Sequence, residues 1–132
     1  MKYLLDTHIL VWLNTNPNKI SLEVKNILLG EDAEIFTSTI SFWEISIKYN
    51  LKKIKLSGGT PETILQSTKK AGIKIFQLTE VQAATLYKLP KYTNKDPFDR
   101  ILAWQAISEN FILISKDKGF DDYKSEGLKR MW

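Results

Sequence analysis

The chain is short, free of cysteine and mildly basic. Its 132 residues are 43% hydrophobic and 26% charged, with a formal net charge of +4. That length suits one domain, residues 1–132, with a single core, and the lack of cysteine excludes disulfide scaffolds, thiolate metal sites and cysteine nucleophiles. No stretch has the length of a membrane span, so we expect a soluble, cytoplasmic protein.

Short apolar runs alternate with helical patterns along the chain. In order, we expect a strand at 2–5, helices at 9–13 and 21–30, a strand at 34–37, helices at 40–49 and 60–71, a strand at 73–77, helices at 79–87 and 96–109, and strands at 111–115 and 129–132. A polar loop, LPKYTNKDP, precedes the last helix. Such alternation predicts an α/β fold of three layers, with a short parallel sheet covered by helices on both faces.

Acidic residues occur at four places where an expected strand gives way to a helix or turn. They are Asp6, Glu44, Asp99 and Asp117. Asp6 and Asp117 follow strands, and we expect Glu44 and Asp99 in the first turns of helices. The carboxyl ends of parallel strands meet at one edge of a sheet, where ligands bind. Carboxylates gathered there repel one another and require a cation, and hard oxygen ligands suit Mg²⁺ or Mn²⁺.

Each of these residues also has a purely structural explanation. Asp6 can cap the helix that follows it, and Asp117 lies in a common turn composition. The sequence SFWE fits a capping box that would use Glu44. In DPFD, Asp96 is the expected cap and Asp99 the third helical residue. Capping explains each residue singly, but it does not explain why all four fall at the same edge.

Other polar residues near these motifs have lesser expected roles. His8 is the only histidine, which excludes a histidine-pair nuclease, and we expect it to pack beside Asp6. Arg100 and Lys116 adjoin proposed ligands and could meet a phosphate. Hydroxyl groups that could bond a carboxylate or a water belong to Thr7, Ser38, Ser41 and Ser115.

Taken together, the motifs resemble those of PIN-domain ribonucleases of the VapC type, the toxin half of a toxin–antitoxin pair. The matching elements are LLDTHILVWL, SFWEISIKYNLKKIKL, the LP before DPFDRILAWQA, and ISKDKGFDDY. They occur in the family's order and spacing over essentially the whole chain. The resemblance places the family's acidic metal ligands on Asp6, Glu44, Asp99 and Asp117, with Asp6 and Asp99 most firmly tied to Mg²⁺. Many relatives have a histidine where Asn94 stands.

The resemblance implies a function and partners. A chain of this kind would be a Mg²⁺- or Mn²⁺-dependent endoribonuclease that hydrolyses RNA with water activated by the metal. It would form a homodimer and bind a cognate antitoxin protein whose tail lies in an apolar groove. Candidate anchors for that partner are Ile9, Trp12, Leu13 and the helix from Phe42 to Ile47.

Alternatives remain open at this point. A receiver-like phosphoacceptor domain is also small, acidic and Mg²⁺-dependent, although Asp6 is followed by Thr7 and His8 rather than by a second acid. A non-enzymatic binding module is a further possibility, and so is a PIN-like nuclease that cuts DNA or processes RNA without being a toxin. The residues alone do not name the RNA target, the number of metal ions or the antitoxin.

Overall fold

The computed structural model describes residues 1–92 and 94–132. The strands are β1 (Lys2–Leu5), β2 (Glu34–Ser38), β3 (Lys74–Phe76), β4 (Ile112–Ile114) and β5 (Lys129–Met131). The α-helices are α1 (Thr7–Thr15), α2 (Leu22–Leu29), α3 (Thr39–Asn50), α4 (Pro61–Lys70), α5 (Glu80–Thr85) and α6 (Pro97–Glu109). Short 3-10 helices are η1 (Pro17–Lys19), η2 (Leu86–Lys88) and η3 (Lys118–Glu126). Within the described residues, no helix is both long and apolar enough to cross a membrane.

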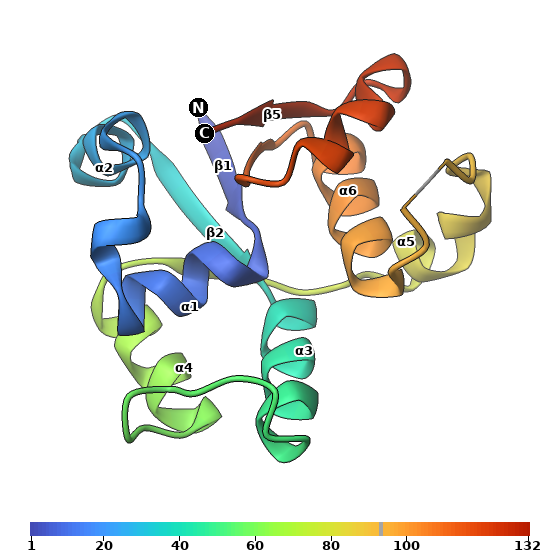
Figure 1. Ribbon diagram of the computed structural model, residues 1–132. Helices are drawn as coiled ribbons and strands as arrows, with labels where there is room; N and C mark the ends of the chain where they lie inside the picture. The colour runs from blue at the N-terminus through green and yellow to red at the C-terminus, as the bar shows by residue number, and fades with distance from the viewer. Residues whose placement is uncertain (93) are drawn as a thin grey trace.

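The five strands form one parallel sheet in the order β3-β2-β1-β4-β5. The first strand is therefore central, and Leu4 pairs with Phe36 on one side and Leu113 on the other. All strands point the same way, so their carboxyl ends gather at one edge, beside the first turns of α1 and α3 (Figure 1). This edge is where residues that follow the strands are brought together.

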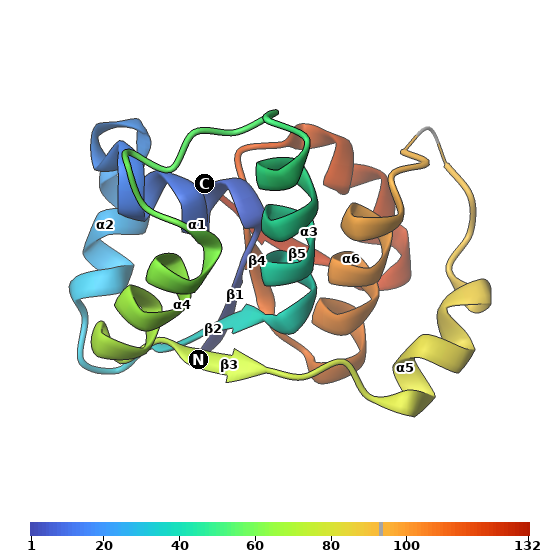
Figure 2. The same ribbon diagram turned by 90° about the horizontal axis from the view of Figure 1, so that it is seen from below.

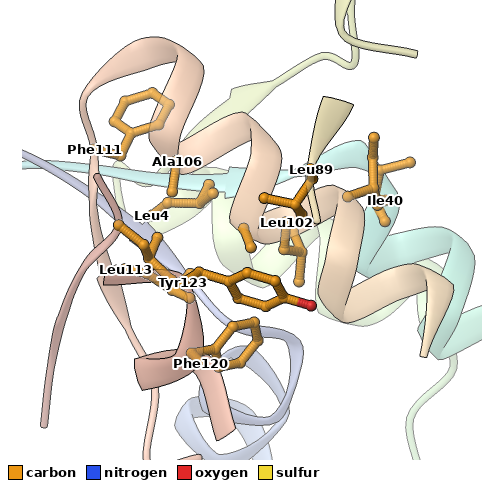
Figure 3. Close-up of a cluster of buried hydrophobic side chains, with 12 residues drawn as sticks. Leu4, Ile40, Leu89, Leu102, Ala106, Phe111, Leu113, Phe120 and Tyr123 are labelled. Carbon is orange, nitrogen blue, oxygen red and sulfur yellow. The ribbon is translucent and has the colours of Figure 1, made fainter. Parts of the chain in front are cut away.

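Alternate side chains of the strands enter two different cores. Leu4 and Leu113 face the side covered by α3, α6 and η3, where a cluster that includes Phe111, Phe120 and Tyr123 is buried (Figure 3). Tyr3, Leu5, Ile35 and Ile114 face the other side and pack on residues of α1 and α2. This alternation with a period of two is the pattern of a sheet buried on both faces.

A third apolar cluster fixes the helices that surround the carboxyl edge of the sheet. Leu10 of α1, Ile45 of α3 and Ile64 of α4 are buried together with Leu56. Helices α3 and α6 lie side by side, and α1, α2 and α4 group on the opposite side (Figure 2). The packing therefore holds α1, α3 and α6 in fixed relation, and these helices supply most of the site.

The expected elements are confirmed in type and order, with small differences at their ends. Ser21, Thr79 and Asp96 cap helices as predicted, through side-chain oxygens that accept backbone N–H groups. The helix expected over 79–87 ends at Thr85 and continues as the 3-10 turn η2. Thr93, in the polar loop before α6, lies outside the described residues.

Candidate active site

The four acidic residues singled out from the sequence line one cavity of about 310 Å³ at the carboxyl edge of the sheet. Its walls come from the ends of β1 and β4 and from α1, α3 and α6. The other residues that line it are Thr7, His8, Val11, Trp12, Ile45, Lys48, Ile54 and Asp96. The fold therefore brings together side chains that are more than a hundred positions apart in sequence.

Asp6 is the most firmly held of the four carboxylates. It is 3% exposed and caps α1, with Oδ1 accepting the N–H of Thr7 at 2.7 Å. Its Oδ2 accepts the hydroxyl of Ser115 at 2.7 Å and lies 3.0 Å from Nδ1 of His8. Thus the capping explanation and the clustering of carboxylates are both correct for this residue.

Ser115 links the first and last carboxylates of the site. Besides donating to Asp6, its hydroxyl oxygen accepts the N–H of Asp117 at 3.0 Å. The side chain of Asp117 caps η3, where Oδ1 accepts the N–H of Gly119 at 2.8 Å. A single buried hydroxyl therefore sets where the chain turns after β4 and where Asp6 points.

Glu44 lies deeper in its helix than the sequence predicted. Helix α3 begins at Thr39, because Ser38 caps it by accepting the N–H of Ile40 at 3.0 Å. The expectation that Glu44 stands in the first turn was wrong, and so was the capping box with Ser41. Glu44 instead follows one turn later with 4% exposure, and so it faces the cavity without serving as a cap.

Lys48 lies one turn beyond Glu44 and forms an ion pair with it. Its Nζ is 2.6 Å from Glu44 Oε2. Burial lowers the pKa of Lys48, but the hydrogen bond and the negative charges of Glu44 and two nearby aspartates outweigh this effect and raise the pKa overall. The other oxygen, Glu44 Oε1, is buried and has no hydrogen-bond partner among residues 1–92 and 94–132. Glu44 is therefore only half satisfied by the protein.

Asp99 is the carboxylate whose charge is least compensated. Asp96 caps α6 by accepting the N–H groups of Phe98 and Asp99, which leaves the side chain of Asp99 free of any capping role. Burial raises the pKa of Asp99 to about 7, and repulsion from Asp6, Asp96 and Glu44 adds to this effect. A hydrogen bond from Asn94 Nδ2 at 3.0 Å opposes it. The site therefore disfavours a full set of negative charges at neutral pH.

Two basic residues expected near the substrate have other positions. The guanidinium of Arg100 donates to the backbone oxygens of Leu89 and Pro90, at 2.9 and 3.0 Å, so it braces the loop before α6 instead of facing the cavity. Lys116 Nζ lies over the ring of Trp12, 6.0 Å from its centroid. Arg100 is therefore turned away from the site, whereas Lys116 lies beside a ring that lines the cavity but is not itself a lining residue.

Two contacts of the site were missed by reasoning from the sequence. One is the pair formed by Glu44 and Lys48, whose spacing of four residues on a helix is itself a signal for an ion pair. The other is Asn94, which was noted only as a departure from the family and which in fact binds Asp99. No sequence signal marks that second contact, because it depends on how the loop folds back.

The chemistry of the cavity fits a divalent cation such as Mg²⁺ or Mn²⁺. Carboxylate oxygens are the hard ligands that these ions prefer. The buried, unpartnered Oε1 of Glu44 and the raised pKa of Asp99 both mark places where a positive charge would be stabilised. In the described part of the chain, no three acidic or histidine side chains already stand close enough to hold an ion.

The chain is similar to known proteins in sequence and in fold. The family model described as PIN domain matches residues 3–126. The chain belongs to the PIN-domain family. Among curated relatives, Ribonuclease VapC22 of Mycobacterium tuberculosis (strain ATCC 25618 / H37Rv) is 24% identical over 129 residues, which is 98% of this chain and 97% of that protein.

Solved structures of similar PIN domains agree with the fold. The structure of VapBC2 from Rickettsia felis, bound to a DNA fragment from its promoter, superimposes with a TM-score of 0.69 at 21% identity and covers 99% of this chain and 98% of that one. The VapBC-1 structure from nontypeable Haemophilus influenzae gives 0.61 at 20% identity, with coverage of 99% and 97%. The predicted three-layer PIN-like fold and the resemblance to VapC-type proteins are thus confirmed.

A larger cavity lies away from the acidic residues. It measures about 470 Å³ and is bounded by α1, α2, α4 and the strands β2 and β3, with Leu13, Leu28, Ile35 and Ile73 among its lining. Its charged lining residues, Glu34 and Lys74, pair with each other at 3.0 Å. It contains no group of carboxylates and therefore does not compete with the acidic cavity as a candidate catalytic site.

Proposed function

We propose that this PIN domain is a divalent-metal-dependent endoribonuclease that acts in the cytoplasm as the toxin of a toxin–antitoxin pair. The observation that carries this proposal is the convergence of Asp6, Glu44, Asp99 and Asp117 on one cavity. The similarity to Ribonuclease VapC22 over nearly the full length of both chains supports an RNA substrate. The chain has no cysteine and only one histidine, and hydrolysis that uses a metal and water needs no protein nucleophile.

Each carboxylate has a role in this proposal. Asp6 and Asp99 would be the principal metal ligands, and Glu44 Oε1 and Asp117 would complete the site or orient water. When bound, the divalent ion would activate water and stabilise the charge on the leaving oxygen. The protein contributes the orientation, because Ser115 fixes Asp6 and Asn94 fixes one oxygen of Asp99.

The decisive experiment is cleavage of RNA by the purified protein, with products mapped at their 5′ ends. Wild-type protein should cut RNA with Mg²⁺ or Mn²⁺, and EDTA should stop the reaction. Asp99→Asn should be inactive although folded, because it removes a ligand that is not used as a helix cap. Single-stranded DNA of the same sequence serves as the second substrate, and preferential DNA cleavage would refute the ribonuclease assignment while leaving the nuclease assignment intact.

The alternative of a receiver-like domain does not agree with the sheet. Doubly wound receiver-like folds have the strand order 2-1-3-4-5, whereas this sheet has the order β3-β2-β1-β4-β5 with two α-helices between β1 and β2. Membership of the PIN-domain family supports the same conclusion. A binding module without activity is disfavoured by the presence of all four acidic side chains in one cavity.

The partners proposed from the resemblance are a cognate antitoxin and a second copy of the chain. Of the suggested anchors, Ile9 is fully buried and belongs to the core. Trp43 is 60% exposed on α3, where its ring meets Phe98 edge-on at 5.3 Å, and Ile47 on the same helix is 36% exposed. An exposed aromatic surface of this kind suits a protein interface, and we propose it for the homodimer.

The antitoxin proposal is tested by co-expression with the product of an adjacent small gene. We expect the chain expressed alone to arrest growth, and Asp6→Asn to be harmless while still co-purifying with that partner. Apolar contacts in the 470 Å³ cavity, lined in part by Leu13 and Leu28, would carry the affinity and are untouched by the substitution. Harmless expression of the intact, active nuclease would refute the toxin role alone.

A further inference from the structure

We propose that Lys48 is a substrate-binding residue whose ammonium contacts a phosphate oxygen of the RNA strand at the acidic cavity, while Glu44 holds it in place. The proposal rests on the ribonuclease function proposed above. Among residues 1–92 and 94–132, Lys48 is the only lysine or arginine in the lining of this cavity. The protein thus places a positive charge in the cavity wall beside Glu44, whereas Arg130, near Asp117, is paired with Asp121.

The position of Lys48 is set by its neighbour on the helix. Glu44 and Lys48 are four residues apart on α3, so both side chains lie on the face directed at the cavity. The 2.6 Å contact with Oε2 fixes the ammonium at the cavity wall, and the side chain of Lys48 keeps 41% of its surface exposed. The buried carboxylate of Glu44 thus fixes the ammonium of Lys48 in place, and a ligand can still reach that ammonium.

The hydrogen-bonding capacity of Lys48 leaves room for a phosphate. An ammonium has three N–H donors, and Glu44 is the hydrogen-bond acceptor assigned to it in the described structure. Glu44 retains Oε1 for the divalent ion, so one carboxylate can serve the ion and the lysine at once. Lys48 and the ion would then approach the same phosphate group from neighbouring positions.

Electrostatics favour a cation of the protein at this position. A phosphodiester that enters a cavity lined by Asp6, Glu44, Asp99 and Asp117 is repelled by their negative charges. Arg100, which adjoins Asp99 in sequence, donates to backbone oxygens of the loop before α6. Lys116 lies over the ring of Trp12 at the cavity wall and is not itself a lining residue. Contacts between lysine and phosphate are independent of base sequence and depend on salt, and these two properties give the test its readouts.

The experiment measures binding of a fluorescent random-sequence single-stranded RNA by anisotropy, with Mg²⁺ present and in the Asp99→Asn background so that the RNA is not cut. Adding Lys48→Met should weaken binding about tenfold, at the low end expected for a lost charge-assisted hydrogen bond. The slope of log Kd against log salt should fall by roughly 0.7, as for one lost phosphate contact on a single strand. Lys48→Arg should recover most of the affinity.

A control for the loss of charge is Lys53→Met, which removes a lysine that is exposed five residues further on. Lys53→Met should change the affinity for RNA less than about twofold, because an exposed lysine away from the bound RNA makes no fixed contact with it. Circular dichroism and urea unfolding confirm that every variant is folded. A loss of affinity shared equally by Lys48→Met and Lys53→Met would overturn the proposal.

The Glu44→Gln background distinguishes two roles of Lys48, namely contact with the RNA phosphate and neutralisation of Glu44. If Lys48 contacts phosphate, Lys48→Met weakens RNA binding whether residue 44 is Glu or Gln. If Lys48 only cancels the charge of Glu44, the effect disappears in Glu44→Gln, and the proposal is wrong. It is equally wrong if Lys48→Met binds as well as its parent, or if the Asp99→Asn protein binds no RNA. If RNA binding depends on Lys48 but the wild-type chain cuts no RNA, the nuclease function alone is refuted.

Discussion

Replacing Asp99 by Asn should remove a pH dependence of stability that the wild-type protein shows without divalent ions. Burial and neighbouring carboxylates raise the pKa of Asp99 from 3.8 to about 7. In the unfolded chain the residue is ionised above its ordinary pKa, whereas in the folded chain it keeps a proton until about pH 7. The folded state therefore binds more protons in that interval, and its free energy of unfolding falls as pH rises.

The size of the effect follows from the shift. At roughly 1.4 kcal/mol per pH unit, the rise of the Asp99 pKa from 3.8 to about 7 corresponds to ~4 kcal/mol as an upper limit. Asp99 is partly exposed, and solvent screening reduces this figure to about 1–2 kcal/mol between pH 5 and pH 8. Asparagine can still accept the hydrogen bond of Asn94 through its side-chain oxygen and carries no charge. Asp99→Asn should thus be the more stable protein at pH 8, and its advantage should shrink towards pH 5.

Urea unfolding at intervals from pH 5 to pH 8, in EDTA, measures this difference. The other ionisable groups are present in both proteins, and their contributions largely cancel when the two curves are subtracted. Asp32→Asn is the matched control, since it removes one negative charge from an exposed bend before β2. If the free energy of unfolding varied with pH in the same way in wild type and in Asp99→Asn, the raised pKa of Asp99 would be refuted.

Three further outcomes are expected. Mg²⁺ or Mn²⁺ should raise the unfolding temperature of the wild type by binding the folded state, and calorimetric scans of Asp6→Asn and Asp99→Asn should show no such rise. Asp96→Ala should lower the free energy of urea unfolding by ~1 kcal/mol through loss of the α6 cap and keep metal-dependent cleavage. Asp99→Ala should keep the free energy of unfolding and lose cleavage. Loss of metal binding in Asp96→Ala alone would mean that the two residues have each other's role. Ser115→Ala should weaken Mn²⁺ binding about tenfold in calorimetric titrations, because its hydroxyl orients Asp6, and unchanged affinity would remove it from the site.

Much of the fold could be predicted because the signals are local. The strand at 2–5 and the caps at Ser21 and Asp96 depend on a few adjacent residues, and the structure has them as expected. The junction of β1 with α1 then placed Asp6 at the carboxyl edge of the sheet, because parallel strands end together. No knowledge of side-chain contacts was needed for that step. Asp99 does not directly follow a strand, contrary to the expectation from the sequence, because α5, η2 and a loop separate β3 from α6.

What could not be predicted depends on tertiary contacts or on competition between similar signals. Ser38 and Ser41 both offer caps for α3, and the earlier one is used, with its hydroxyl also donating to Gln105 of α6 at 2.7 Å. That choice moves Glu44 out of the first turn and points it into the cavity. Arg100 likewise turns away from the site because the loop before α6 presents carbonyl oxygens to it. Neither choice is visible in the order of residues.

The four carboxylates differ in how well the protein compensates their negative charge, and this difference indicates which of them a bound ion should stabilise most. Each carboxylate accepts a hydrogen bond, but the donors differ in strength. Glu44 is held by an ammonium, and Asp6 by a backbone N–H and a hydroxyl. Asp99 has the neutral amide of Asn94 as its hydrogen-bond donor, and repulsion from its neighbours remains. A cation stabilises most the group that is compensated least, so the free energy of ion binding should depend on Asp99 more strongly than on Asp6 or Glu44.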